Sequence, residues 1–354
     1  MGKKGKEAAR ERREQRRREV THLRTVPYEP HQRWWGHLER GPARAVAVVT
    51  GANRGIGFEA ARQLALHGLH VVVASRDAER GQAAAELIRA EASGEAGVSV
   101  ECRQLDVADA ASVKAFAAWA AETHGGIHVL VSRFPSSCLL LVSCHIVRNE
   151  QQLCVHCVNF NKGAENSVEF AQQVIETNYY GTKRMIDAMI PLMKPSPYGG
   201  RIVNVSSRLG RVNGRRNISF LDRIGDVGLR DQLLNDDCLS EELIDEMITK
   251  FLEQVKQSNW PSNHWPQMYT DYSVSKLAVN AYTRLMAKRL SDQAEGQKIY
   301  MNCFCPGWVK TAMTGWEGNI SAEEGADTGV WLALLPQEQS TNGKFFAERC
   351  EISF

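Results

Sequence analysis

Short apolar segments alternate with longer amphipathic segments from Ala45 to the end of this 354-residue chain, and this alternation is the strongest constraint on its fold. The apolar segments have the length of buried β-strands, and the amphipathic segments have the period and length of α-helices. Strands that alternate with helices form a parallel sheet covered by helices on both faces. We therefore predict an α/β fold, a single doubly wound parallel sheet formed by residues 45–354.

The predicted elements follow this pattern. Strands are expected at Ala45–Val49, His70–Ala74, Val98–Arg103, His128–Val131, Arg201–Val205, Tyr300–Phe304 and Lys344–Phe346. Helices are expected at Gly55–Leu66, Ala78–Glu91, Ala110–Glu122, Ser167–Met193, Tyr272–Arg289 and Ala322–Leu334. Two segments interrupt the alternation, an atypical insert at residues 132–157 and a longer insertion at residues 209–268 with a charged helix at Ser240–Gln257.

Residues 1–44 precede the alternation, and we expect them to be a charged, disordered appendage. Residues 1–45 contain 13 Lys and Arg against 6 Asp and Glu, but the whole chain carries a net charge of only +2. Acidic residues interrupt each basic cluster between Lys3 and Arg18, so a solvated tail is favoured over a nucleic-acid-binding or nuclear-targeting arm. We predict no nucleic-acid partner.

The sequence also argues against export and membrane insertion. No stretch reaches the ~18 apolar residues of a spanning helix, and the nearest, Cys138–Val147, is about half that length. No apolar segment typical of a secretory signal follows the basic N-terminus. The nine cysteines are an odd number, which favours free thiols over a disulfide framework. We predict a cytoplasmic protein with no membrane partner.

A glycine-rich turn joins the first predicted strand to the first predicted helix. Glycines at such a turn let a diphosphate approach the backbone N–H groups at the positive end of the helix. A turn that only requires left-handed residues is the alternative, and the strand–turn–helix context favours the phosphate site. The predicted cofactor-binding residues here are Gly51, Asn53, Arg54, Gly55, Ile56 and Gly57.

The residues after the second predicted strand distinguish between two dinucleotides. Arg76 lies 19 positions after Gly57, where a cation would bind the 2′-phosphate of NADP and an acid would bind the 2′-hydroxyl of NAD. Arg54 is a second candidate cation. Asp77 is the NAD-type alternative, but it also precedes a helix that needs an N-cap. We therefore predict NADPH/NADP as the cofactor.

Tyr272 and Lys276 are four residues apart in a predicted helix and therefore lie on one face. Because a fixed cation favours the phenolate, we expect Lys276 to lower the pKa of Tyr272. Ser206 and Ser207 follow the strand Arg201–Val205, at the sheet edge where open parallel sheets bind ligands. A Tyr-x3-Lys pair is common by chance, so it indicates a site only in combination with the serines and the glycine turn.

Together these motifs resemble the short-chain dehydrogenase/reductase family, from about Ala45 to the C-terminus. The motifs, in chain order, are the turn with Gly51, Gly55 and Gly57, the pair Asp106-Val107, Asn178 within Glu176–Thr182, Asn204–Ser207, Tyr272-x3-Lys276, and Pro306–Thr311. The resemblance implies a Rossmann-type, NADPH-dependent reductase that transfers hydride to a small-molecule ketone or aldehyde.

The resemblance also implies roles for individual residues. Tyr272 would donate the proton, Ser207 would hold the substrate oxygen, and Lys276 would bind the hydroxyls of the nicotinamide ribose. Asn178 would complete a proton relay through an ordered water. Further cofactor contacts implied by the family are Asp106 and Val107 near the adenine, and Pro306, Gly307, Val309 and Thr311 around the nicotinamide.

The long spacing between Ser207 and Tyr272 resembles the monomeric carbonyl-reductase branch, which includes the salutaridine and menthone reductases of plants. In that branch the insertion covers the helical face through which other members oligomerise. The resemblance therefore implies a monomer.

The chain departs from the family pattern after its fourth predicted strand. The family carries Asn-Asn-Ala-Gly or a close variant there, beside the cofactor, whereas this chain continues into Ser132-Arg133-Phe134-Pro135. We hypothesise that Ser132–Cys157 derives from a retained intron or a shifted splice boundary. The alternative function is therefore a catalytically impaired, reductase-like binding protein.

Residues 132–157 also contain conceivable zinc ligands. The segment holds only one C-x2-C pair, without the second spaced pair of a structural zinc site, so we predict no metal. The residues considered are Cys144, His145, Cys154, His156 and Cys157.

Overall fold

The computed structural model describes the chain from Ala45 to the C-terminus with internal gaps. The described residues are 45–91, 98–133, 168–196, 198–214, 224–260, 265–266, 269–294, 296–336 and 339–354. Residues 1–44 and 134–167 lie outside them, so the expectations for the N-terminal appendage and for the cysteines of the insert stay predictions.

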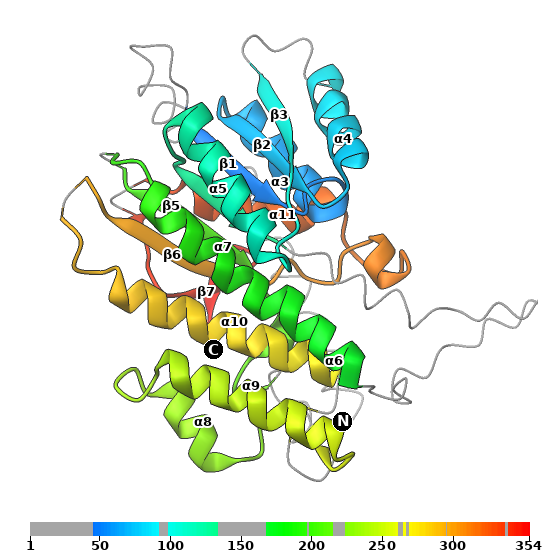
Figure 1. The fold of residues 1–354 in the computed structure, drawn as a ribbon, viewed down its shortest axis with the longest axis vertical. Coiled ribbons are helices and arrows are strands. Elements are labelled where there is room, and N and C mark those ends of the chain that lie inside the picture. The colour runs from blue at the N-terminus through cyan, green and yellow to red at the C-terminus, as the bar shows by residue number, and fades with distance from the viewer. Residues whose placement is uncertain are drawn as a thin grey trace, which may run out of the picture.

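One eight-stranded sheet forms the centre of the molecule, in the order β3-β2-β1-β4-β5-β6-β7-β8 (Figure 1). All neighbouring strands are parallel except β7 and β8. The chain order reverses between β1 and β4, and open sheets of this kind bind ligands at the carboxyl ends beside such a reversal. The strands are β1 (Val46–Thr50), β2 (His70–Ser75), β3 (Ser99–Gln104), β4 (Val129–Ser132), β5 (Gly200–Val205), β6 (Ile299–Phe304), β7 (Phe345–Ala347) and β8 (Cys350–Ile352).

Helices cover both faces of this sheet, and each face has its own hydrophobic core. The central strands are buried on both faces, which is why they appear in the sequence as continuous apolar runs. One face is covered by α5 (Ala110–His124), α6 (Val168–Ile175), α7 (Gly181–Met189) and α10 (Thr270–Arg289). The other face is covered by α3 (Gly55–Leu66), α4 (Ala78–Glu91) and α11 (Ala322–Leu334).

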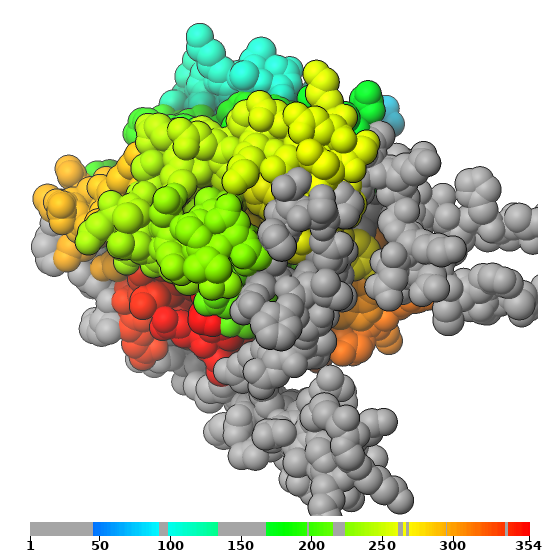
Figure 2. Space-filling model, turned by 90° about the horizontal axis from the view of Figure 1, so that it is seen from below, coloured from blue at the N-terminus to red at the C-terminus, as the bar shows by residue number. Residues whose placement is uncertain are grey.

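The insertion before Tyr272 adds a further layer outside α10. Its helices are α8 (Val227–Leu234) and α9 (Glu241–Lys256), and α9 packs on α6 and α10. Figure 2 shows their yellow-green atoms forming the surface on this side of the molecule.

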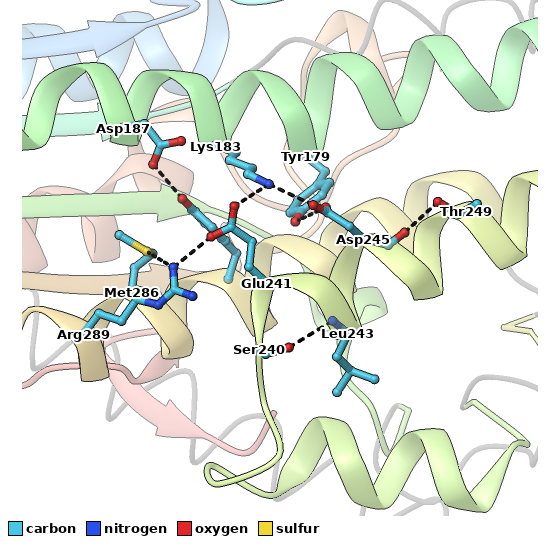
Figure 3. A network of polar contacts seen from close by, with 11 residues as sticks. Tyr179, Lys183, Asp187, Ser240, Glu241, Leu243, Asp245, Thr249, Met286 and Arg289 are labelled. Carbon is cyan, nitrogen blue, oxygen red and sulfur yellow. Dashed lines mark hydrogen bonds and ion pairs between the residues drawn. The ribbon is translucent and has the colours of Figure 1, made fainter.

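A polar network ties α9 to the helices beneath it (Figure 3). The Tyr179 hydroxyl donates to Asp245 at 2.8 Å, and the Lys183 ammonium bridges Asp245 at 2.9 Å and Glu241 at 2.7 Å. Arg289 of α10 also pairs with Glu241, at 2.8 Å. Because each acid satisfies two donors, the network fixes the position of α9 on the underlying helices.

The predicted doubly wound sheet is confirmed, and the differences are local. The helix expected at Ser167–Met193 is divided by the π-helix η2 (Glu176–Tyr180) and ends in the 3-10 turn η3 (Ile190–Leu192). Strand β8 was not predicted, because it has three residues and follows a turn whose left-handed residues are not glycine or asparagine. Helix α8 was also not predicted. Among the described residues, no helix combines the length and apolar character needed to cross a bilayer.

Candidate active site

The glycine-rich turn lies between β1 and α3, at the carboxyl edge of the sheet. Gly51 and Gly55 have left-handed φ angles of 60° and 58°, and a Cβ on Gly57 would lie 2.5 Å from the Gly51 carbonyl oxygen. The first turn of α3 has no acidic residue, and its N-cap Arg54 makes no side-chain capping bond. The backbone N–H groups in the first turn of α3 are therefore not capped by a side chain of the described residues. They are available to an anion such as the diphosphate of a dinucleotide. Ile56 anchors the turn in the core, and Asn53 is partly exposed.

Tyr272 and Ser207 meet at the same edge of the sheet. Ser207 directly follows β5 and begins the 3-10 turn η4 (Arg208–Gly210), whereas Tyr272 lies in the first turn of α10. The Ser207 side chain lies close enough to the Tyr272 phenol to lower its pKa. The neighbouring Ser206 is buried, and its hydroxyl donates to the Lys276 backbone carbonyl at 3.3 Å. Of the two serines, the structure therefore places Ser207 beside the Tyr272 side chain.

Lys276 is buried one helical turn after Tyr272. Its Nζ lies 5.7 Å from the centre of the Tyr272 ring and donates to the Val205 carbonyl at 2.9 Å. Burial lowers the pKa of Lys276 to about 7, and the charge of Arg133 adds to this effect. Lys276 is therefore an amine whose protonation changes near neutral pH, held beside the phenol.

The expected effect of Lys276 on the Tyr272 pKa is corrected by the structure. Desolvation by the surrounding protein raises the pKa of Tyr272 above its ordinary value, and Cys305 adds to the increase. The Ser207 side chain and the charge of Arg133 lower the pKa, but their effects are smaller. A burial effect of this kind cannot be predicted from a four-residue spacing, because it depends on the packing around the phenol. Tyr272 is consequently a protonated phenol at neutral pH.

Asn178 lies in the π-helix η2 and is completely buried. Its side-chain amide donates to the Ser275 hydroxyl at 3.0 Å, and that hydroxyl donates to the Tyr272 carbonyl at 2.7 Å. The Asn178 Oδ1 atom has no hydrogen-bond partner in the described part of the chain. An unsatisfied buried acceptor beside α10 is compatible with an ordered water at this position. A π-turn of this kind often marks a functional site.

Arg133 is a site residue that the sequence analysis did not select. It directly follows β4, is 5% exposed, and donates from Nη1 to the carbonyls of Gly51 at 2.9 Å and Arg54 at 3.2 Å. Its backbone is fixed by two bonds of 2.8 Å with the Thr50 hydroxyl. Burial lowers the pKa of Arg133 to about 10, with a further contribution from Arg54. Its position immediately after β4, where the strand order reverses, was the signal in the sequence that could have identified it as a site residue.

The electrostatics around Arg133 are unbalanced. No carboxylate of the described residues pairs with this guanidinium, and its charge also acts on Lys276 and Tyr272. Two buried cations thus lie within electrostatic range of each other, between the glycine turn and the phenol. Such an arrangement is stabilised by an anion, because buried charges normally require a partner.

The predicted selector residues lie at the carboxyl end of β2. Arg76 is exposed, and none of the described acidic side chains forms an ion pair with it. Asp77 accepts a bond of 3.0 Å from the Arg80 N–H and caps α4. This capping bond is the structural alternative that the sequence analysis left open for Asp77. Arg54 is also exposed, on the glycine turn.

The remaining predicted cofactor residues border the same edge. Asp106 and Val107 follow β3, where Asp106 caps the turn through the Ala108 N–H at 3.0 Å and Val107 is buried against Gly181. The segment after β6 also approaches the glycine turn, since a Cβ on Gly55 would lie 3.3 Å from a Thr311 methyl group. The structure places Pro306, Gly307, Val309 and Thr311 in this segment, with Val309 and Thr311 buried.

Comparisons with known proteins agree with this geometry. The family model for short chain dehydrogenase matches residues 45–134 and ends just inside residues 132–157, where the chain departs from the family motif. A (+)-neomenthol dehydrogenase of Arabidopsis thaliana is 36% identical over 307 residues, covering 86% of this chain and 96% of that protein. Carbonyl reductase 1 of Homo sapiens, whose name specifies NADPH, is 33% identical, covering 86% of this chain and 96% of that protein.

Solved structures show the same relationship. Salutaridine reductase from Papaver somniferum superposes with a TM-score of 0.68 at 32% identity, covering 86% of this chain and 99% of that chain. Menthone neomenthol reductase from Mentha piperita superposes with a TM-score of 0.65 at 32% identity, covering 87% of this chain and 99% of that chain. With this identity extending over most of both chains, the protein belongs to the short-chain dehydrogenase/reductase family of oxidoreductases.

Proposed function

We propose that this protein reduces a small-molecule ketone or aldehyde with NADPH, and that Tyr272 donates the proton. The observation that carries this proposal is the convergence of Ser207, Tyr272 and the buried Lys276 at the carboxyl edge of the sheet. The carbonyl reductase and the menthone and salutaridine reductases among its relatives support this substrate class.

The proposed roles follow from the protonation states and contacts of these side chains. The raised pKa keeps the Tyr272 phenol protonated, so its hydroxyl can donate to the carbonyl oxygen. Ser207 would donate a second hydrogen bond to that oxygen and stabilise its developing negative charge. Lys276 would bind ribose hydroxyls, and Asn178 would hold a water that restores the proton. The nicotinamide, when bound, supplies the hydride.

NADPH is the proposed cofactor because of the charges at the end of β2. Exposed Arg76 and Arg54 are available to a 2′-phosphate, whereas Asp77 is engaged in capping α4. Fluorescence titration with NADPH and NADH tests this preference. Arg76→Ala is expected to weaken NADPH binding about tenfold and leave NADH binding nearly unchanged, since only NADPH carries the phosphate. Equal weakening for both cofactors would contradict the proposed role.

We also propose a monomer, because α9 covers α10. Exposed acidic and polar side chains line the outer surface of α9, among them Glu242, Glu246 and Glu253. A charged surface of this kind is a poor core for a stable interface. Light scattering at micromolar concentration tests this, and a cytoplasmic location stays a prediction.

Tyr272→Phe is the decisive test of the mechanism. Removing the hydroxyl is expected to lower the rate of NADPH oxidation with a panel of carbonyl compounds by about 10²- to 10⁴-fold. Tyr300→Phe is the matched control, because Tyr300 packs against Arg201 near the amino end of β6. Full activity in Tyr272→Phe would remove Tyr272 as the proton donor.

A second candidate function is a catalytically impaired, reductase-like binding protein. Arg133 favours it, because its guanidinium lies against the carbonyls of the glycine turn, next to where a diphosphate would bind. Replacing residues 132–157 by a short Asn-Asn-Ala turn discriminates between the two candidates. A large gain in NADPH affinity together with new carbonyl reduction would favour the second candidate for the natural chain. Turnover by the unaltered chain would favour the first.

A further inference from the structure

Two histidines and a glutamate meet at the amino-terminal edge of the sheet, away from the glycine turn. His70 begins β2, Glu101 is the third residue of β3, and His124 is the last residue of α5. The register pairs His70 with Ser99, so Glu101 lies two residues further along the same face of β3. Helix α5 packs on this face and brings His124 to the same point.

The ligand atoms of these three side chains are directed at one another. One donor atom from each residue lies within 4.8 Å of the other two. The Nε2 atoms of both histidines are 2.7 Å from the same oxygen of Glu101. The His124 Nε2 is buried and makes no hydrogen bond within the described residues, so its short contact with Glu101 lacks hydrogen-bond alignment.

The surrounding groups hold both imidazoles in place. The Ser99 hydroxyl lies 2.7 Å from the His70 Nδ1, which leaves Nε2 facing the cluster. The Trp119 ring packs edge-on against His124 at 5.2 Å, and Gly125 ends α5 with a left-handed φ of 64°. Outer contacts that orient an imidazole are a regular feature of metal sites.

The local charges leave the cluster suited to a cation. The C-terminal end of α5 carries a partial negative charge, and Glu101 adds a full one. Lys194 is the opposing cation here, because its ammonium lies near Gly125. Arg103 is engaged over the Trp119 ring, 5.0 Å from its centre.

We propose that His70, Glu101 and His124 bind a divalent transition-metal ion, zinc, with water completing the coordination. Two imidazole nitrogens and one carboxylate oxygen are a donor set that zinc accepts in a tetrahedral site with one open position. The ion would connect β2, β3 and α5 and replace the close contacts around Glu101 with metal–ligand bonds. This site is independent of the proposed reductase activity and of the cysteines in residues 132–157.

The test is metal binding by the full chain, freed of tags and treated with a chelator. Calorimetric titration with Zn²⁺ is expected to show a site that His124→Ala weakens about 100-fold or more, because a direct ligand contributes at least as much as an outer contact. Glu101→Gln should also weaken binding, while its amide oxygen can still accept from the histidines and preserve the fold. Co²⁺ should give visible absorption bands typical of nitrogen and oxygen ligands in the unaltered protein.

Two control variants separate this site from other zinc ligands. His67→Ala removes a histidine outside the cluster and should leave Zn²⁺ affinity unchanged. Cys154→Ser/Cys157→Ser removes the only C-x2-C pair of the insert and should leave the cluster site intact. The proposal is overturned if Zn²⁺ binding is undetectable in the unaltered protein, or if it persists in both His124→Ala and Glu101→Gln. Loss of binding in the cysteine variant alone would also overturn it.

Discussion

The exits of β5 and β4 are neighbours in the sheet, but they present different kinds of chemistry. At the β5 exit, Ser207 lies beside Tyr272 of α10, and the Lys276 ammonium donates to the carbonyl of Val205, the last residue of β5. At the β4 exit, Arg133 places against the glycine turn a charge that no carboxylate of the described residues pairs with. The residues at the β5 exit match the motif that the family carries there. The residues at the β4 exit replace the family's Asn-Asn-Ala-Gly motif.

The difference shows how far a motif determines a site. A serine at a strand end and a Tyr-x3-Lys pair on one helix converge because strand edges and helix faces have fixed geometry. The charge balance depends on every side chain that reaches the same space, and Arg133 enters it from a third strand. The reaction geometry can therefore be preserved while the electrostatic environment of the cofactor site changes.

Among the tests that compare the two exits, the largest effect is expected at the β5 exit, for Ser207→Ala. Removing a hydroxyl that would stabilise the developing oxyanion should lower kcat about 100-fold, with the fold intact. Steady-state kinetics with NADPH and a reactive carbonyl compound measures this. Ser206→Ala is the matched control, because Ser206 contacts the Lys276 backbone instead of Tyr272. Equal losses in the two variants would show that the two serines act only through the packing of α10.

A smaller effect is expected from Asp271, which adjoins Tyr272 and is buried. Burial raises the pKa of Asp271 to about 7, and its Oδ1 has no hydrogen-bond partner within the described residues. A raised folded-state pKa means that stability is fully present at pH values below the unfolded pKa near 4 and falls as pH rises through about 7. Asp271→Asn should therefore leave unfolding unchanged near pH 4.

At pH 8 the same variant should unfold with a free energy higher by on the order of 2 kcal/mol, because it carries no buried charge. Denaturant titrations at the two pH values measure the difference. Exposed Asp237→Asn is the control and should change little at either pH. A gain of equal size at both pH values would indicate a packing effect and not a titration. The Asp271 result also measures how strongly a buried charge in α10 destabilises the fold, for comparison with the buried charge of Arg133 at the β4 exit.

The sequence predicted most of the fold, for physical reasons, and it singled out Ser207, Tyr272 and Lys276, which the structure brings together. Continuous apolar strands and complete helical periods identify buried elements, as at β5 and α10. The raised pKa of Tyr272 was not predictable, since desolvation depends on the packed environment. Arg133 was missed because its role depends on the approach of β4 to the glycine turn. The cluster at His70 joins residues up to 54 positions apart in the chain, so no local spacing reveals it.

The smallest predicted effect is that of Arg133→Met on NADPH binding. It distinguishes an Arg133 that binds the cofactor's diphosphate from an Arg133 that obstructs the cofactor site. Two buried cations, Arg133 and Lys276, repel each other, and a cofactor diphosphate would relieve this repulsion. Arg133→Met keeps the length of the side chain and removes its charge. It should weaken NADPH binding about tenfold, equivalent to about 1.4 kcal/mol. Fluorescence titration measures this, with exposed Arg89→Met as the control.

The same variant should also change the pH dependence of the reaction. Arg133 lowers the pKa of Lys276, so its removal should raise that pKa from about 7. Since Lys276 loses its charge as pH rises through its pKa, the alkaline limb of the kcat/KM profile should move to higher pH in Arg133→Met. Tighter NADPH binding with an unshifted profile would mean that Arg133 occupies space the cofactor needs. In that case Arg133 at the β4 exit would compete with the cofactor for the same space. It would thereby limit the activity that Ser207 and Tyr272 at the β5 exit support.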